Sequence, residues 1–346
     1  MAVAATAAGA AITVAPVEAA GDRPVVIATM SIWADVVDQL DCADTVDVQT
    51  LIPAGGDPHA YEPSMQDRDR LGDAALVVVN GAGLEAGLID TLDAAAGDGT
   101  ALFAVTDHVT THAMDEGDHD DEIEHDESAD AHDESDHDEG DHDESGHDES
   151  GHDDGDDHAD HDHTGADPHV WLDPTLVAEA VPALAEALVA AGADESEISD
   201  CADTLIASLE DLDAEISALV EQIPPEQRLL VTNHDALGYF ARRYGFEVLG
   251  SVLPSSSTLV EASPAELDEL ADTIEAANGG NGVPAIFAEA LEATDDATAL
   301  GDRLGVEVVT LYTDSLGEEG SGADTYQAML LSDAALIIDA LTGQDR

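Results

Sequence analysis

The sequence predicts an α/β fold of two lobes, each with a mainly parallel sheet flanked by helices, joined by one long helix. Short β-rich runs alternate with helical periods from Val25 to Val105, and the same alternation returns from Leu229 to Thr310. Such alternation is typical of parallel sheets with crossover helices. Between the two units, residues 195–221 carry apolar side chains at helical spacing, and a pair of prolines follows them.

The first unit is expected to contain four strands, with helices between them. Ser31 is the expected N-cap of the first helix, because a serine hydroxyl suits that position. The strands are predicted over 25–29, 46–51, 75–79 and 102–105, and the helices over 32–40 and 65–71.

The second unit follows two helices. They are predicted over 174–191 and 195–221, and the second of them is the long helix that joins the lobes. Strands are predicted over 229–232, 247–252, 285–287 and 307–310, with helices between them and a closing helix over 326–341.

An acidic, histidine-rich insert separates these patterns. Residues 108–163 hold twelve histidines and 26 acids, and histidine recurs every five positions from His132 to His152 in repeats close to HDESG. Glycine, serine and dense like charge predict disorder. Two interpretations stand: a solvated linker in which histidine is incidental, or a flexible collector that raises the local metal concentration.

The charge balance excludes one class of partner. The chain has 79 acids and 8 bases, all of them arginine, for a net charge of −71. A nucleic-acid partner is not expected, because phosphate binding needs a basic patch. More than half of the acids lie outside the insert, so the folded part is acidic too. A lysine-free acidic surface predicts a halophilic, haloarchaeal source, in which salt screens the self-repulsion.

The two cysteines leave two interpretations open. Cys42 and Cys201 are far apart in the sequence, and no Cys-x-x-Cys pair is present. They are expected to be either two buried apolar thiols or a disulfide between lobes.

The first 20 residues are mostly small and apolar, which is typical of the end of an export signal; a disordered leader is the alternative. The expected organisation is a leader or truncated signal segment (1–22), an N-terminal α/β lobe (23–107), a disordered insert (108–165), the remainder of that lobe (166–194), a linking helix (195–223) and a C-terminal α/β lobe (224–346).

Three histidines lie outside the insert, and each occupies a loop beside a predicted strand or the insert. His59 lies in a loop with two glycines and three prolines, His169 lies in a second Asp-Pro-His triplet, and His234 follows the strand over 229–232. Ligands of open α/β sheets bind at the carboxyl ends of strands. Unrelated surface histidines are the alternative, but three of three at such positions favour one shared metal site.

Asp314 is the best candidate for a fourth ligand, because it follows the last predicted strand of the second lobe. Imidazole suits zinc, copper, nickel and iron, and a set of imidazoles with one carboxylate is compatible with zinc or manganese.

Four segments resemble the motifs of the metal-binding solute receptors of ABC importers, the cluster that delivers zinc or manganese. The segments are DPHAYEP at 57–63, DPHVWLDP at 167–174, NHDALGYF at 233–240 and LYTDSLG at 311–317. The resemblance runs in order over about residues 24 to 342. It implies two α/β lobes bridged by a rigid helix, with a metal ion clamped between them.

Carried over by motif position, the metal ligands are His59, His169, His234 and Asp314. A histidine in the third position tends to accompany zinc in this family, so His234 favours Zn²⁺ over Mn²⁺ as the transported ligand. The resemblance implies a non-enzymatic receptor at the extracellular face of the cell membrane. It is expected to act as a monomer with the permease and ATPase components of an ABC transporter.

Two other functions stay open, a hydrolase that uses the same histidines and a metal buffer. A zinc-dependent hydrolase needs an open metal position and a general base, for which Glu62 is the nearest candidate in the sequence. A surface metal buffer would rely mainly on the insert.

Deleting residues 115–160 is expected to leave the tight metal site intact, because the four expected ligands lie outside that segment. Isothermal titration with Zn²⁺ should show one tight site in both proteins. Weak binding to the insert should be absent after the deletion and should fade below about pH 6 in the full chain, since histidine binds metal only when neutral. Loss of the tight site on deletion would contradict this expectation.

Overall fold

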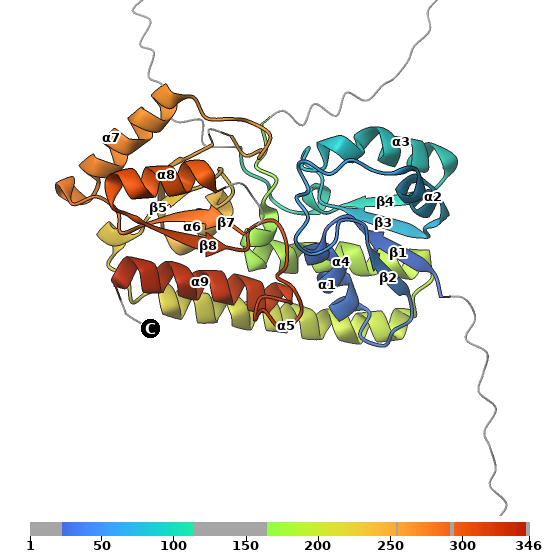
Figure 1. Ribbon diagram of the computed structural model, residues 1–346. Helices are drawn as coiled ribbons and strands as arrows, with labels where there is room; N and C mark the ends of the chain where they lie inside the picture. Colours follow the sequence, from blue (N-terminus) through green and yellow to red (C-terminus); the bar gives the residue numbers. More distant parts are fainter. Residues whose placement is uncertain (1–22, 114–164, 254, 291–293, 344–346) are drawn as a thin grey trace, which may run out of the picture.

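The computed structural model describes residues 23–113, 165–253, 255–290 and 294–343. Over these ranges the chain forms two parallel four-stranded sheets in two lobes that lie side by side, with a long helix running along both (Figure 1). The predicted fold class is confirmed. The expected leader and most of the histidine-rich insert lie outside the described residues.

The sheet of the N-terminal lobe has the strand order β2-β1-β3-β4, and every pairing is parallel. Successive strand residues face opposite sides: Val78 shares a core with α1 and α4, whereas Val77 packs in a second cluster with Leu71 and Leu92. The elements are β1 Val25–Ala28, α1 Ser31–Leu40, β2 Asp47–Thr50, α2 Met65–Asp73, β3 Leu76–Val79, α3 Ile89–Asp98, β4 Ala101–Ala104 and α4 Pro174–Ala191.

The sheet of the C-terminal lobe repeats the arrangement with the order β6-β5-β7-β8. One face packs against α7 and α8 through Val231 and Ile286, and the other face contributes Leu230 and Phe287 to the core beside α9. The elements are β5 Leu229–Thr232, α6 Gly238–Tyr244, β6 Glu247–Ser251, α7 Pro264–Gly280, β7 Ala285–Glu289, α8 Asp295–Leu304, β8 Glu307–Leu311 and α9 Tyr326–Thr342.

The helix α5, Glu195–Val220, joins the lobes and lies in a core that both lobes share. Its buried side chains, Leu205, Leu209, Leu212 and Ile216 among them, recur at helical spacing and pack with residues of both lobes. Apolar burial on this scale holds the helix in place against both sheets. One helix therefore fixes the position of both lobes.

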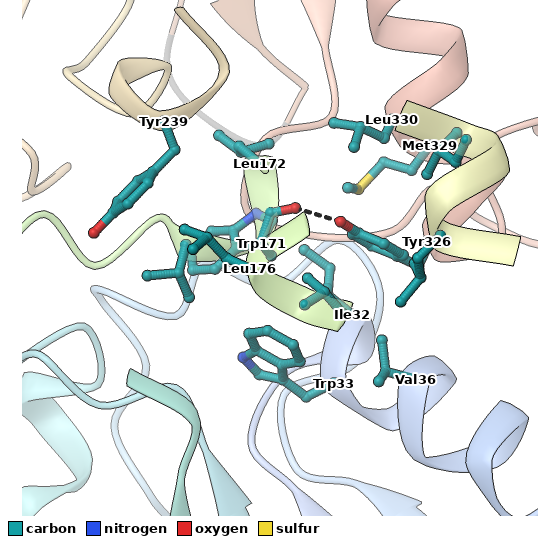
Figure 2. Close-up of a cluster of buried hydrophobic side chains, with 14 of the residues drawn as sticks. Ile32, Trp33, Val36, Trp171, Leu172, Leu176, Tyr239, Tyr326, Met329 and Leu330 are labelled. Carbon is teal, nitrogen blue, oxygen red and sulfur yellow. Dashed lines mark hydrogen bonds between the residues drawn. The ribbon is translucent and has the colours of Figure 1, made fainter. Parts of the chain in front are cut away.

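Trp171 lies at the centre of the shared core. It belongs to the 3₁₀ turn η3, Val170–Leu172, and its indole Nε1 donates a hydrogen bond to the Thr313 carbonyl at 2.6 Å. The Tyr326 hydroxyl donates to the Trp171 carbonyl at 2.6 Å (Figure 2). The ring of Trp33 meets Trp171 edge-on at 6.4 Å between centroids. These contacts join the two lobes through one buried turn.

By length and composition alone, α4 is long and apolar enough to cross a membrane. In this fold it packs against α5 and against β3 and β4, and Leu176, Val181 and Leu188 are buried there. A core helix of a folded domain passes the same test.

The predicted strands and helices agree with the structure to within one or two residues at most ends, and α3 is an addition. Its sequence, IDTLDAAAGD, has too few large apolar residues to show a helical period. The expectation that Ser31 is the N-cap of α1 is wrong. Met30 occupies that position without a side-chain cap, and the Ser31 hydroxyl instead accepts a hydrogen bond from the Leu316 amide at 3.0 Å.

Cys42 and Cys201 form a disulfide, with a Cα–Cα distance of 6.0 Å. The interpretation as two buried thiols is wrong, since Cys42 is exposed just after α1. The bond joins the N-terminal lobe to α5, so it restrains that lobe against the linking helix.

The expected start of the insert also needs correction. Residues 108–113 are described: the His108 ring stacks on Phe103 at 4.4 Å, and Ala113 forms an antiparallel bridge with Ala166. Their few apolar side chains gave no sign of these contacts in the sequence.

Asp333 on α9 is a carboxyl group buried in the core. Its Oδ1 accepts a hydrogen bond from the Tyr312 amide at 3.1 Å, and its Oδ2 forms none within the described residues. Burial raises the pKa of Asp333 well above its ordinary value, by more than the Tyr312 hydrogen bond lowers it. The folded chain therefore holds this proton to a higher pH than the unfolded chain does.

The stability that this proton uptake contributes is present below the unfolded pKa of about 4 and is lost as the pH rises through the folded pKa. We expect Asp333→Asn to raise the free energy of unfolding more at pH 7 than at pH 4, measured by urea unfolding at constant high salt. Asp272→Asn, at an exposed position of α7, is the control. An equal effect of Asp333→Asn at both pH values would contradict the raised pKa.

Candidate metal centre

The four expected ligands meet where the carboxyl ends of the two sheets face each other. His59 lies in the loop between β2 and α2, and His169 immediately precedes η3. His234 follows β5, and Asp314 follows β8. Parallel sheets place all such loops at one edge, and the two lobes turn these edges toward each other.

The side-chain atoms lie at ligand-like distances. Asp314 Oδ2 is 3.4 Å from Nε2 of both His59 and His234, and Asp314 Oδ1 is 3.8 Å from Nε2 of His169. One ligand atom from each of the four residues lies within 4.8 Å of every other. Ligands of a tetrahedral zinc ion at about 2.0 Å stand roughly 3.3 Å apart. The constellation is therefore slightly wider than a closed zinc shell.

All four residues are buried, with at most 5% of any one exposed. Within the described part of the chain, Nε2 of His59 and His169 and both Asp314 oxygens are buried and form no hydrogen bond. Such polar atoms are costly to bury without a partner. A cation among them would satisfy them, so the donor set fits a bound metal ion.

Two further carboxylates orient the imidazoles. Asp167 Oδ1 lies 2.8 Å from Nδ1 of His169, and Glu289 Oε2 lies 3.3 Å from Nδ1 of His234. At His169 a proton on Nδ1 donates to Asp167, and at His234 the Nδ1 atom faces the Glu289 carboxylate as an ion-pair partner. A carboxylate on the Nδ1 side favours the tautomer that leaves Nε2 to face the centre, as in many metal sites. Both rings therefore have their Nε2 lone pairs directed at the shared point.

Glu289 also fixes the loop of the fourth ligand. Its Oε1 accepts hydrogen bonds from the Asp314 amide at 2.9 Å and from the Thr313 hydroxyl. One side chain at the end of β7 thus positions both ligands of the C-terminal lobe. Sequence reasoning assigned Glu289 no role, and its place at a strand end facing the site was the one signal available.

The charge state of Asp314 follows from its neighbours. Burial acts to raise its pKa, but the electrostatic attraction of the facing imidazoles of His234, His59 and His169 outweighs burial and lowers the pKa of Asp314 well below its ordinary value. The carboxylate is therefore ionised at neutral pH. Imidazole must be neutral to bind a metal ion, so in the metal-bound form the four ligands together carry one negative charge.

Glu62, the general base that a hydrolase would need, is exposed on the surface, whereas the four ligands are buried. A hydrolytic zinc ion also keeps one position for water, and here four protein ligands converge. The geometry suits capture of an ion better than attack on a substrate.

Comparison with known proteins gives the same picture over nearly the whole chain. Residues 26–340 match the ZnuA family, described as zinc-uptake complex component A, periplasmic. The zinc-binding protein TroA of Treponema pallidum is 28% identical over 330 residues, covering 93% of this chain and 90% of TroA. The solved structure of TroA has a TM-score of 0.71 and covers 92% of this chain and 99% of its own.

Two other relatives carry manganese in their names. The manganese-binding lipoprotein MntA of Halalkalibacterium halodurans is 26% identical over 324 residues, covering 93% of this chain and 90% of MntA. The manganese ABC transporter substrate-binding lipoprotein PsaA of Streptococcus anginosus is 25% identical over 331 residues, with the same coverage of 93% and 90%.

Glu289→Gln is expected to weaken metal binding about 10- to 100-fold, the range typical of outer-shell partners. A glutamine amide that donates to Nδ1 of His234 would favour the tautomer with its proton on Nε2, where the metal must bind. Competition against a chromophoric chelator measures the change, with the exposed Glu318→Gln as control. An affinity equal to that of the control would show that Glu289 does not orient His234.

Proposed function

Because this chain belongs to the ZnuA family of periplasmic zinc-uptake components, we propose that it is a receptor that captures Zn²⁺ outside the cytoplasm and delivers it to an ABC importer. The observation that carries the proposal is the convergence of His59, His169, His234 and Asp314 at one buried point between two lobes. Relatives over the same length are metal-binding proteins, one of them by name the substrate-binding component of an ABC transporter.

The choice of zinc over manganese rests on the donor set. Three imidazoles and one carboxylate make a four-coordinate shell with a net charge of +1 around Zn²⁺, and zinc binds such tetrahedral nitrogen-rich sites. Manganese prefers more oxygen ligands and an octahedral shell. His234 is the decisive residue, since an oxygen ligand in its place would move the site toward manganese.

Release to a transporter requires that the ion be held by both lobes. His59 and His169 belong to the N-terminal lobe, and His234 and Asp314 to the C-terminal lobe. Separation of the lobes would divide the shell into two pairs and weaken the hold on the ion. A permease and an ATPase at the membrane are the partners that this role needs, and we place the receptor, as a monomer, at the extracellular face.

The histidine-rich insert fits this role as a collector that supplies the tight site. Its repeats lie outside the described residues, so the proposal rests on their sequence: neutral imidazoles every five positions, tethered to the receptor. A surface metal buffer would use the same residues but would need no buried four-ligand centre.

Metal analysis of protein purified without added metal tests the proposal. We expect one tightly held Zn²⁺ per chain, weaker binding of Mn²⁺, and loss of the tight ion in His234→Ala. His108→Ala, at an exposed histidine outside the centre, is the matched control. Several weak ions without a tight one would favour the buffer, and metal-dependent turnover that Glu62→Gln abolishes would favour the hydrolase; either result would overturn the receptor.

A further inference from the structure

The two Asp-Pro-His triplets fold into the same local turn. Asp57 Oδ1 accepts a hydrogen bond from the His59 amide at 2.8 Å, and Asp167 Oδ1 accepts one from the His169 amide at 3.0 Å. An aspartate that accepts from the amide two residues on stabilises a turn by itself. In each triplet the aspartate thus fixes the backbone that carries a metal-ligating histidine.

A hydroxyl group of the C-terminal lobe holds each of these aspartates. The Thr258 hydroxyl donates to Asp57 Oδ2 at 2.8 Å, and the Tyr239 hydroxyl donates to the Asp167 carbonyl at 3.0 Å. Thr258 lies in the loop between β6 and α7, and Tyr239 lies in the first turn of α6. A hydroxyl of the C-terminal lobe therefore contacts the aspartate of each triplet, at the carboxylate of Asp57 and at the backbone carbonyl of Asp167.

Tyr239 is closely fitted to its triplet. Its side chain is buried and extends from α6, with the hydroxyl directed away from Trp171 (Figure 2). The hydroxyl also accepts a hydrogen bond from the His112 amide at 3.1 Å, and the Asp167 amide donates to the His112 carbonyl at 2.9 Å. A Cβ at Gly238 would come within 2.7 Å of Asp167 Oδ2, so a larger residue there would displace this carboxylate.

Thr258 belongs to a segment that is tied to the third ligand. The Leu253 amide donates to the Asn233 carbonyl at 2.7 Å, and the Asp235 amide donates to the Ser255 carbonyl at 3.0 Å. These hydrogen bonds join the loop of Thr258 to the residues on both sides of His234. A contact between Asp57 and Thr258 therefore connects the surroundings of two metal ligands from different lobes.

We propose that Thr258 and Tyr239 are positioning residues through which the C-terminal lobe sets the geometry of both histidines of the N-terminal lobe. The inference rests on the proposed function and extends it. The C-terminal lobe supplies two ligands of its own and also holds the turns that present His59 and His169. Separation of the lobes would break the hydrogen bonds of both hydroxyls to the two triplets. His59 and His169 would then no longer be held in their metal-binding orientation, at the same time as His234 and Asp314 move away.

The test compares Thr258→Val and Tyr239→Phe, which remove one hydroxyl each and preserve the size of the side chain. From the net strength of a hydrogen bond, each should accelerate Zn²⁺ dissociation about 2- to 10-fold, measured by stopped-flow transfer to a chelator. Thr258→Ser should restore the slow rate. Thr273→Val on the exposed face of α7 and Tyr244→Phe at the far end of α6 are the matched controls.

A second measurement needs no metal. Spin labels at Asp93→Cys on α3 and Glu275→Cys on α7, both exposed positions, report the distance between the lobes. In the metal-free protein, Thr258→Val and Tyr239→Phe should shift the distance distribution toward longer values. The control variants should leave the distribution unchanged.

The outcomes separate this inference from the receptor function. Unchanged dissociation rates with an unchanged distance distribution would overturn the positioning role, even if the wild-type chain binds one tight Zn²⁺. Lower thermal stability of the metal-free variants with unchanged dissociation rates would show that the hydroxyls serve folding alone, which also overturns it. Absence of a tight ion in the wild type would defeat the receptor, while the distance measurement would still decide whether the hydroxyls hold the lobes together.

Discussion

The buried carboxylate of Asp314 among three imidazoles is the constraint on which the rest of the structure depends. Four polar side chains that are almost wholly buried face one point, and among the described residues Nε2 of His59, Nε2 of His169 and both Asp314 oxygens form no hydrogen bond. Without a bound ion this cluster costs stability, because unsatisfied polar groups in a core are unfavourable and apolar side chains would pack there at lower free energy. A divalent cation at that point would satisfy these polar atoms and offset the cost of their burial. Its binding free energy would then help to hold the two lobes together.

The fold divides the four ligands of this centre equally between the two lobes. Each sheet delivers two ligands from loops at its carboxyl end, while α5 and the buried turn around Trp171 hold the sheets in a common frame. The disulfide between Cys42 and Cys201 restrains the N-terminal lobe on the same helix. Carboxylates at the back of the rings, Asp167 and Glu289, then set which nitrogen of each imidazole faces inward.

The sequence predicted the fold and singled out four side chains that the structure brings together, because both leave local signals. Parallel strands that are buried on both faces read as short apolar runs, and His59, His169 and His234 each stand in a marked loop. What it did not predict depends on contacts between distant segments. Glu289 is one acid among 79, the Ser31 hydroxyl bonds across the lobe boundary instead of capping α1, and the pairing of Cys42 with Cys201 spans 159 residues. Composition, spacing and periodicity carry no information on such partners.

X-ray absorption at the zinc edge tests the central claim most directly. The spectrum should be recorded on the chain loaded with one equivalent of Zn²⁺, with and without residues 115–160. We expect four nitrogen or oxygen ligands at about 2.0 Å with the scattering of three imidazoles, identical in both proteins, and two imidazoles in His59→Ala. A six-coordinate oxygen shell, or an imidazole count that falls when the insert is removed, would contradict it.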